Sequence, residues 1–242
     1  MLHNDQVQDK KWFDRIASGF QMPVIDQVLV EDLFNANREC IQQHFFYNDE
    51  DGRSSFQNFL YSFKSTPNWS FEDKNTFVKF QSTSGSKVII YANKPEFEVN
   101  GVQDIQTEMT EKSISPKVIV HRGHSFHTEK TLSIIPGDTK VIIVGSCSGY
   151  YKLPIALERA PASHAIATRQ IGTMRVNDPL IKGFCEKVRQ GKNIIWSDFW
   201  SEVESSCGRN SMFYDYIPPH KNLGSLFLQA YFESIDNAKL QQ

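Results

Sequence analysis

A histidine and a cysteine each follow a short apolar run in the middle of the chain. The run 118–120 leads to His124, and the run 141–144 leads to Cys147. Both runs are β-branched and do not alternate with polar residues, which is typical of a strand buried on both faces of a parallel sheet. A thiolate is a good nucleophile, and a histidine beside it can act as its base. The two residues are therefore candidates for a nucleophile and base pair.

The segment between the two runs predicts that they form one βαβ unit. Residues 126–135 are expected to form a short helix, and residues 136–138 (Pro-Gly-Asp) a turn. The crossover should be right-handed, so that both strands end at the same edge of the sheet. Open α/β sheets place their sites at that edge. We therefore expect His124 and Cys147 to be neighbours, although they are 23 positions apart (147 minus 124).

The surroundings of the cysteine suit acyl transfer. A helix expected over 150–160 would start just past Cys147, and a helix N-terminus carries about half a positive charge, which lowers a thiol pKa. The small Ser148 and Gly149 allow a sharp turn of the backbone. The backbone N–H groups of Cys147 and Ser125 are candidate donors to an oxyanion. His124 can accept the thiol proton and return it to a leaving amine.

Two other histidines flank His124 and leave its assignment open. His121 is close to the strand and can be a structural residue, and His127 is expected on the following helix. The spacing HxxHxxH could also bind a metal ion. That alternative is weak, because the run begins on a strand and no carboxylate pattern lies nearby. We therefore predict no metal and no cofactor.

The rest of the chain predicts an α/β fold with an N-terminal extension. Strands alternate with helices from residue 85 onward, which favours a three-layer α/β/α sandwich with a mostly parallel sheet. Apolar residues at 3- and 4-residue spacing predict that residues 1–70 are a separate helical region preceding an α/β domain over 71–242. The expected helices cover residues 9–16, 23–46, 54–63, 99–112, 150–160, 178–190 (with Pro179 in its first turn), 196–205 and 224–235. The expected strands cover residues 77–80 and 87–91 (a hairpin), 118–120, 141–144 and 164–168.

Composition narrows the class of protein. The 242 residues carry a formal net charge of −2, which gives no basic footprint for nucleic acid. No apolar run is long enough to span a membrane, and the first residues lack the apolar core of a signal peptide. The four cysteines show no CxxC pair and do not resemble a disulfide framework. We therefore expect a cytoplasmic protein without membrane or nucleic-acid partners.

An apolar strand that ends in GHS, followed by one that ends in SCSG, resembles the caspase-like (clan CD) cysteine peptidases. This group includes gingipains, legumains, separases and CHAT-type peptidases. The resemblance covers residues 85–200 and implies a caspase-like fold with His124 as base and Cys147 as nucleophile. It also implies oxyanion donors at the amides of Ser125 and Cys147. Ser125 stands where the family usually has glycine, and the QACxG signature of true caspases is absent.

The resemblance implies a peptide or protein substrate, with a regulatory partner or upstream domain as a further option. In this group the strand after the cysteine helix lines the specificity pocket, which here points to Arg169 and Gln170. Arg169 would favour an acidic residue, whereas Asp178 would favour Arg or Lys. Ser146 could line the pocket floor. Arg169 and Asp178 could equally be solvated or pair with each other.

Two other function classes stay open. A caspase-like module without catalytic activity would serve as a scaffold or sensor, although it would not need both Cys147 and His124. An amidohydrolase with the same pair would act on a small substrate. A long groove beside Cys147 would favour the peptidase, and a closed pocket would favour the amidohydrolase.

Overall fold

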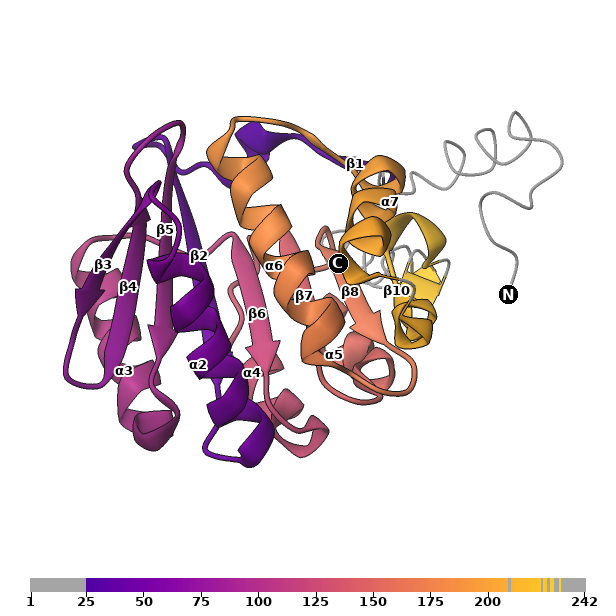
Figure 1. Cartoon of the computed structure of the whole chain (residues 1–242), viewed down its shortest axis with the longest axis horizontal. Coiled ribbons are helices and arrows are strands. Elements are labelled where there is room, and N and C mark those ends of the chain that lie inside the picture. The colour runs from indigo at the N-terminus through magenta and orange to yellow at the C-terminus, as the bar shows by residue number, and fades with distance from the viewer. Residues whose placement is uncertain (1–24, 209, 223, 226, 229–230, 232–242) are drawn as a thin grey trace, which may run out of the picture.

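The computed structural model describes residues 25–208, 210–222, 224–225, 227–228 and 231. The chain forms a mixed α/β structure around an eight-stranded sheet with the order β10-β8-β7-β6-β2-β5-β4-β3 (Figure 1). The five strands from β8 to β5 run parallel, and β10, β4 and β3 are antiparallel to their neighbours. A mostly parallel sheet, predicted from the alternation of strands and helices, is therefore confirmed.

The five parallel strands in the middle of the sheet are buried along almost their whole length. These are β2 (Glu39–Phe46), β5 (Lys87–Asn93), β6 (Val118–Arg122), β7 (Val141–Val144) and β8 (His164–Thr168). The outer strands are β3 (Trp69–Asp73), β4 (Phe77–Ser82) and β10 (Tyr216–Ile217), and β1 (Gln27–Val28) pairs with β9 (Ile194–Ile195) in a separate small sheet. The predicted hairpin is confirmed as β4 and β5.

Helices cover both faces of the sheet (Figure 1). One face packs against α2 (Glu50–Lys64), α6 (Met174–Arg189) and α7 (Trp196–Cys207), and the other packs against α3 (Glu98–Glu111), α4 (Thr128–Leu132) and α5 (Leu153–Arg159). Alternate residues of one strand serve the two faces: Val118 and Val120 join the first core, and Ile119 joins the second. Unbroken apolar strands follow from this burial on both faces.

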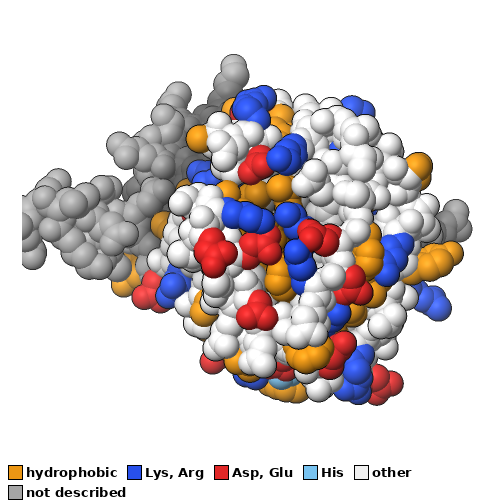
Figure 2. All heavy atoms as spheres, turned by 90° about the vertical axis from the view of Figure 1, so that its left-hand side faces the viewer, with side chains coloured by type: hydrophobic (Ala, Val, Ile, Leu, Met, Phe, Trp, Pro, Cys, Tyr) orange, Lys and Arg blue, Asp and Glu red, His pale blue; other side chains and the backbone are white. Residues whose placement is uncertain are grey.

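The edge of the sheet at β3 carries charges of both signs. Figure 2 looks onto the side of the molecule where β3 and β4 lie, and it shows acidic and basic side chains interspersed there. Salt bridges join Lys74 to Glu72 at 2.5 Å and Lys94 to Asp73 at 2.7 Å. Charged side chains on an edge strand oppose pairing with another chain.

The predicted helix over 23–46 is wrong. Its last third is β2, which is hydrogen-bonded between β5 and β6 at the centre of the sheet. Gln42, Gln43 and His44 are buried in that strand and interrupt its apolar residues, so that the pattern imitates a helical period. Within residues 25–70, β2 thus belongs to the central sheet and α2 packs on it, so this part of the chain is not a separate helical region.

The other predicted elements differ from the structure mainly at their ends. The helices expected over 54–63, 99–112 and 196–205 are confirmed as α2, α3 and α7. Helix α6 begins at Met174, four residues before the predicted start, so Pro179 lies inside the helix. The predicted helix over 9–16 lies outside the described residues, and the one over 224–235 extends into residues that are not described. Among the described helices, none is both long and apolar enough to cross a membrane.

Candidate active site

Strand pairing brings His124 and Cys147 to the same edge of the sheet, as predicted. In the parallel register His121 lies opposite Val144, and His124 and Cys147 each follow three residues later. Both residues line one cavity of about 140 Å³ at the carboxyl ends of β6 and β7. The side chain of His124 is 45% exposed, and Cys147 is half-buried.

Backbone contacts hold the segment that carries Cys147. Ser148 has a left-handed conformation with φ of 56°, and its N–H donates to the carbonyl of Gln170 at 2.7 Å. The hydroxyl of Thr168 donates to the carbonyl of Ser146. The chain then passes through a 3-10 turn (Gly149–Lys152) before α5 begins. The predicted start of an α-helix directly after Cys147 is therefore wrong, and Cys147 lacks the charge of an adjoining α-helix N-terminus.

The His124 side chain lies between a carboxylate and an aromatic ring. Its Nδ1 is 3.4 Å from Asp51 Oδ2 in the first turn of α2. Its ring stacks on that of Phe126, with 5.6 Å between the ring centroids. A carboxylate beside one ring nitrogen orients a histidine and leaves the other nitrogen for proton transfer.

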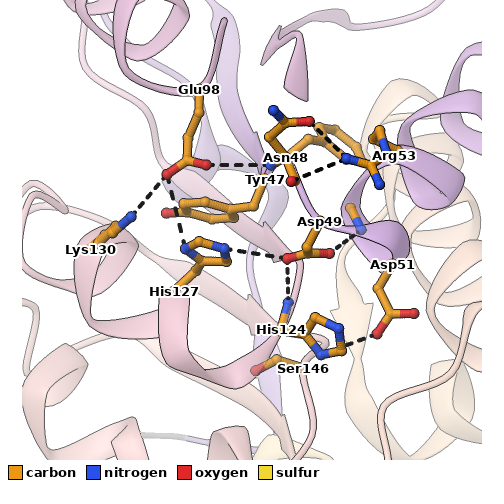
Figure 3. A network of polar contacts seen from close by, with 12 residues as sticks. Tyr47, Asn48, Asp49, Asp51, Arg53, Glu98, His124, His127, Lys130 and Ser146 are labelled. Carbon is orange, nitrogen blue, oxygen red and sulfur yellow. Dashed lines mark hydrogen bonds and ion pairs between the residues drawn. The ribbon is translucent and has the colours of Figure 1, made fainter. Parts of the chain in front are cut away.

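A second carboxylate fixes the backbone of the same loop. Asp49 Oδ2 accepts a hydrogen bond from the His124 N–H at 3.1 Å and lies 3.4 Å from His127 Nε2 (Figure 3). Asp49 Oδ1 accepts from the Gly52 N–H at 2.7 Å and caps α2. The His127 ring stacks on Tyr47, with 4.2 Å between centroids. These contacts join β2, α2 and the loop after β6 into one support for His124.

The floor of the cavity is polar and buried. Arg122 closes it from the end of β6, with its Nη2 donating to Asp178 Oδ1 at 2.9 Å and to Ser55 Oγ at 2.8 Å. Burial lowers the pKa of Arg122, and the Asp178 carboxylate opposes that shift. Burial also raises the pKa of Asp178, whereas Arg122 lowers it. The Arg122 guanidinium is buried, and the Asp178 carboxylate compensates its positive charge, so the two form one ion pair.

The predicted substrate-binding residues lie in different places. Ser146 lines the cavity, but its hydroxyl is buried and lies 3.1 Å from Thr128 Oγ1. Asp178 pairs with Arg122 and lines a second hollow, not the cavity with Cys147. Arg169 and Gln170 are exposed and also lie outside its lining, and Arg169 Nη2 donates to the carbonyl of Tyr214 at 3.2 Å. Of the four, only Ser146 lines the cavity with Cys147.

The two predicted oxyanion donors lie on the two loops that form the rim. Ser125 starts the 3-10 turn Ser125–His127 directly after His124. Among the described residues, none accepts a hydrogen bond from the backbone N–H of Ser125 or of Cys147. Both N–H groups therefore keep their hydrogen-bonding capacity for a ligand.

The remaining thiols are poor nucleophiles. Burial raises the pKa of Cys40 to about 12 and also raises the pKa of Cys185 and of Cys207. A raised pKa lowers the thiolate fraction at neutral pH. Among the four thiols, only Cys147 lines the cavity with His124.

The neighbouring histidines have structural contacts. His121 is fully buried, its Nδ1 lies 2.8 Å from Thr131 Oγ1, and burial lowers its pKa to about 3. His127 belongs to the stack with Tyr47. Within the described part of the chain, no three His, Cys, Asp or Glu side chains are placed to hold a metal ion together.

Sequence reasoning missed the residues that support the histidine and form the cavity floor. Asp49 and Asp51 lie in the polar run 48–53, where an Asp before an acidic first turn is a typical helix start. In the sequence, Arg122 is a single charge shortly after the apolar run 118–120, with no pattern that marks it as part of a site. Nothing in the sequence pointed to Ser55 or Asn177, because each faces the cavity through tertiary packing.

Comparison with protein-family models, with curated proteins and with solved structures found no significant match for this chain. The resemblance to caspase-like peptidases therefore stays a prediction, supported by the residues that carry it and by their arrangement.

Proposed function

We propose that this chain is a cysteine peptidase of caspase-like fold, with Cys147 as nucleophile and His124 as general base and acid. The observation that supports it is the parallel β6–β7 register, which puts both residues in one cavity at the carboxyl edge of the sheet. The carboxyl edge of the sheet is where α/β proteins place their sites, and a cysteine with a histidine is a chemically matched nucleophile and base.

The proposed reaction is acyl transfer followed by hydrolysis. His124 takes the Cys147 proton, and the sulfur attacks the peptide carbonyl carbon to give a tetrahedral oxyanion. The backbone N–H groups of Ser125 and Cys147 donate to that oxyanion. The intermediate then collapses to a thioester, and the amine leaves with the proton from His124. Water, deprotonated by His124, attacks the thioester and releases the acid and the thiol.

Two carboxylates would support the base. Asp51 lies beside His124 Nδ1 and would orient the ring, and Asp49 holds the backbone N–H of the same residue. Neither would touch the substrate carbonyl, so both are positioning residues in this mechanism.

The test is site-resolved alkylation by iodoacetamide, followed by peptide mass spectrometry, in wild type and in His124→Ala. Cys207 is an internal reference, because it is also half-buried but lies at the end of α7, outside the cavity. We expect Cys147 to react much faster than Cys207 at neutral pH, and His124→Ala to lose that lead. Equal rates for the two thiols in wild type would contradict the Cys–His pair.

The size of the cavity favours a second candidate, an amidohydrolase with the same pair. A volume of about 140 Å³ suits one small guest, because a cavity of roughly 150 Å³ holds a benzene-sized molecule. Turnover separates the two candidates. A peptidase would cleave a hexapeptide faster than a capped single-residue amide, because contacts outside the cavity would add to transition-state binding. The reverse order would favour the amidohydrolase.

A further inference from the structure

A buried contact between two hydroxyls joins the loop that carries His124 to the loop that carries Cys147. Thr128 Oγ1 and Ser146 Oγ lie 3.1 Å apart, and the two residues are 0% and 2% exposed. Thr128 begins α4, four positions after His124, and Ser146 directly precedes Cys147. One hydrogen bond therefore connects the two loops close to the residues of the proposed pair.

The turn between His124 and Thr128 is closed by backbone hydrogen bonds. The His127 N–H donates to the His124 carbonyl at 3.1 Å, and the Thr128 N–H donates to the Ser125 carbonyl. Because these bonds leave the turn little freedom of its own, a displacement of Thr128 would move the backbone of His124 with it.

Ser146 is fixed through both its backbone and its side chain. Its carbonyl accepts from the Thr168 hydroxyl and from the Gly149 N–H, and its hydroxyl contacts Thr128. Cys147 follows directly after Ser146, so the position of its backbone depends on these contacts. Of them, only the contact with Thr128 leads to the loop of the proposed base.

The same hydrogen bond is the end of a longer buried chain of side chains. His121 Nε2 lies 3.4 Å from Thr128 Oγ1, and His121 Nδ1 lies 2.8 Å from Thr131 Oγ1. Thr131 Oγ1 in turn lies 2.7 Å from the hydroxyl of Tyr47 on the far side. Burial lowers the pKa of His121 to about 3, so at pH 7 its neutral ring has one donor and one acceptor nitrogen. A buried network whose members are all paired holds them in one arrangement.

A second contact between the same two segments lies in solvent. Lys152 Nζ is 2.5 Å from Glu129 Oε1, but the two side chains are 37% and 61% exposed. Exposed ion pairs contribute little in water, whereas breaking a buried hydrogen bond leaves a polar group without a partner. The contact between Thr128 and Ser146 is therefore the stronger constraint on the two loops.

We propose that Thr128 and Ser146 are positioning residues that set the geometry between His124 and Cys147. This inference rests on the proposed function, in which His124 takes the proton of Cys147. Neither hydroxyl acts on the substrate in this role. Ser146, predicted as part of a pocket floor, instead acts through the bond of its buried hydroxyl with Thr128.

The test is the pH dependence of site-resolved alkylation of Cys147 by iodoacetamide, with Cys207 as the reference thiol. Thr128→Val keeps the shape of the side chain and removes the hydroxyl. We expect the rate at pH 7 to fall by about tenfold and the midpoint of the profile to move to higher pH, because an ordinary thiol is only a few per cent ionised at pH 7. Thr128→Ser keeps the hydroxyl and should retain the wild-type profile.

Thr139→Val is the matched control. Thr139 is 1% exposed, and its hydroxyl donates to the Pro116 carbonyl at 3.4 Å. This bond joins the segments that precede β6 and β7, whereas the bond of Thr128 joins the segments that follow them. Thr139→Val thus loses a buried hydroxyl between the same two strands at the opposite edge of the sheet. It should keep the wild-type pH profile even where it lowers the stability of the fold.

Ser146→Ala removes the other hydroxyl of the same bond. It should shift the profile in the same direction, and it keeps the test valid if Thr128→Val fails to fold. Because the two residues act through one bond, the double variant should show the same profile as either single variant. Additive shifts in the double variant would show that the two residues act independently and would overturn the shared role.

The outcomes separate this inference from the proposed function. A wild-type profile in folded Thr128→Val and Ser146→Ala would overturn the positioning role and leave the Cys–His pair intact. A shift in Thr139→Val or in Thr128→Ser as large as that in Thr128→Val would also overturn it, because the hydroxyl of Thr128 would not be the cause. If Cys147 of the wild type reacts no faster than Cys207, the proposed function fails and the inference fails with it.

Discussion

The carboxylate of Asp49 accepts a hydrogen bond from the backbone N–H of His124, with 3.1 Å between nitrogen and Oδ2. The other oxygen of the same carboxylate caps helix α2 through the Gly52 N–H. One side chain therefore fixes the loop that carries the proposed base relative to the start of a helix from a distant part of the sequence.

We expect Asp49→Ala to lower both stability and the reactivity of Cys147. Loss of a helix cap costs about 0.5–2 kcal/mol of unfolding free energy, and the His124 loop loses an anchor. Urea unfolding and site-resolved alkylation measure the two effects. Asp49→Asn is the matched control, because asparagine caps a helix as well as aspartate does but can place an NH₂ where His124 needs an acceptor. Wild-type behaviour of Asp49→Ala in both measurements would contradict this role.

Gly172 permits a close approach that shapes the cavity wall. A Cβ at this position would lie 2.2 Å from the carbonyl oxygen of Gly145, so the backbone must shift. We expect Gly172→Ala to lose about 1–3 kcal/mol of unfolding free energy and to reduce the lead of Cys147 over Cys207 in alkylation. Gly137→Ala is the control: its nearest atom would be 3.3 Å away, and it lies outside the cavity. Equal effects of the two substitutions would argue against a special role for Gly172.

His121 makes stability depend on pH. Burial lowers its pKa from 6.5 to about 3, so the folded chain disfavours its protonated form. The stability that this provides is fully present above pH 6.5 and is lost as the pH falls toward 3, at about 1.4 kcal/mol per pH unit. We expect unfolding free energies measured between pH 7 and pH 4.5 to fall less steeply in His121→Gln. Parallel pH profiles of the two proteins would show that His121 is not the group responsible.

The aromatic cluster on the α2 face stabilises the fold. Phe63 is 1% exposed and lies 5.0 Å from Trp69 and 5.4 Å from Phe80, measured between ring centroids. We expect Phe63→Ala to cost about 3–5 kcal/mol of unfolding free energy in urea titrations. Tyr61→Ala in the same helix is the control, because Tyr61 is 77% exposed and should cost far less. A cost below about 1 kcal/mol for Phe63→Ala would contradict this packing.

The sequence by itself determined those strands and helices whose pattern of apolar residues matches the side chains that are buried in the folded chain. The apolar runs before His124 and Cys147 predict parallel strands, and the segment between them is too short for anything but one crossover. Their proximity followed from topology alone. The same approach failed for β2, because Gln42, Gln43 and His44 are buried in its middle and break the apolar run. Periodicity detects the pattern of side chains, whereas a central strand is defined by the two strands that are hydrogen-bonded to its edges and by the helices that cover its faces.

Only the tertiary structure decided what surrounds the proposed pair. Asp51 reaches His124 from helix α2, which lies more than seventy positions earlier in the sequence (124 minus 51 is 73). Arg122, at the end of β6, is held by Asp178 and Ser55, which approach it from two different helices. Asn177 reaches the end of β7 from helix α6, where its Nδ2 donates to the carbonyl of Gly145. Each of these contacts joins residues distant in sequence, so no local pattern encodes it, and only the packing of helices on the sheet brings the groups together.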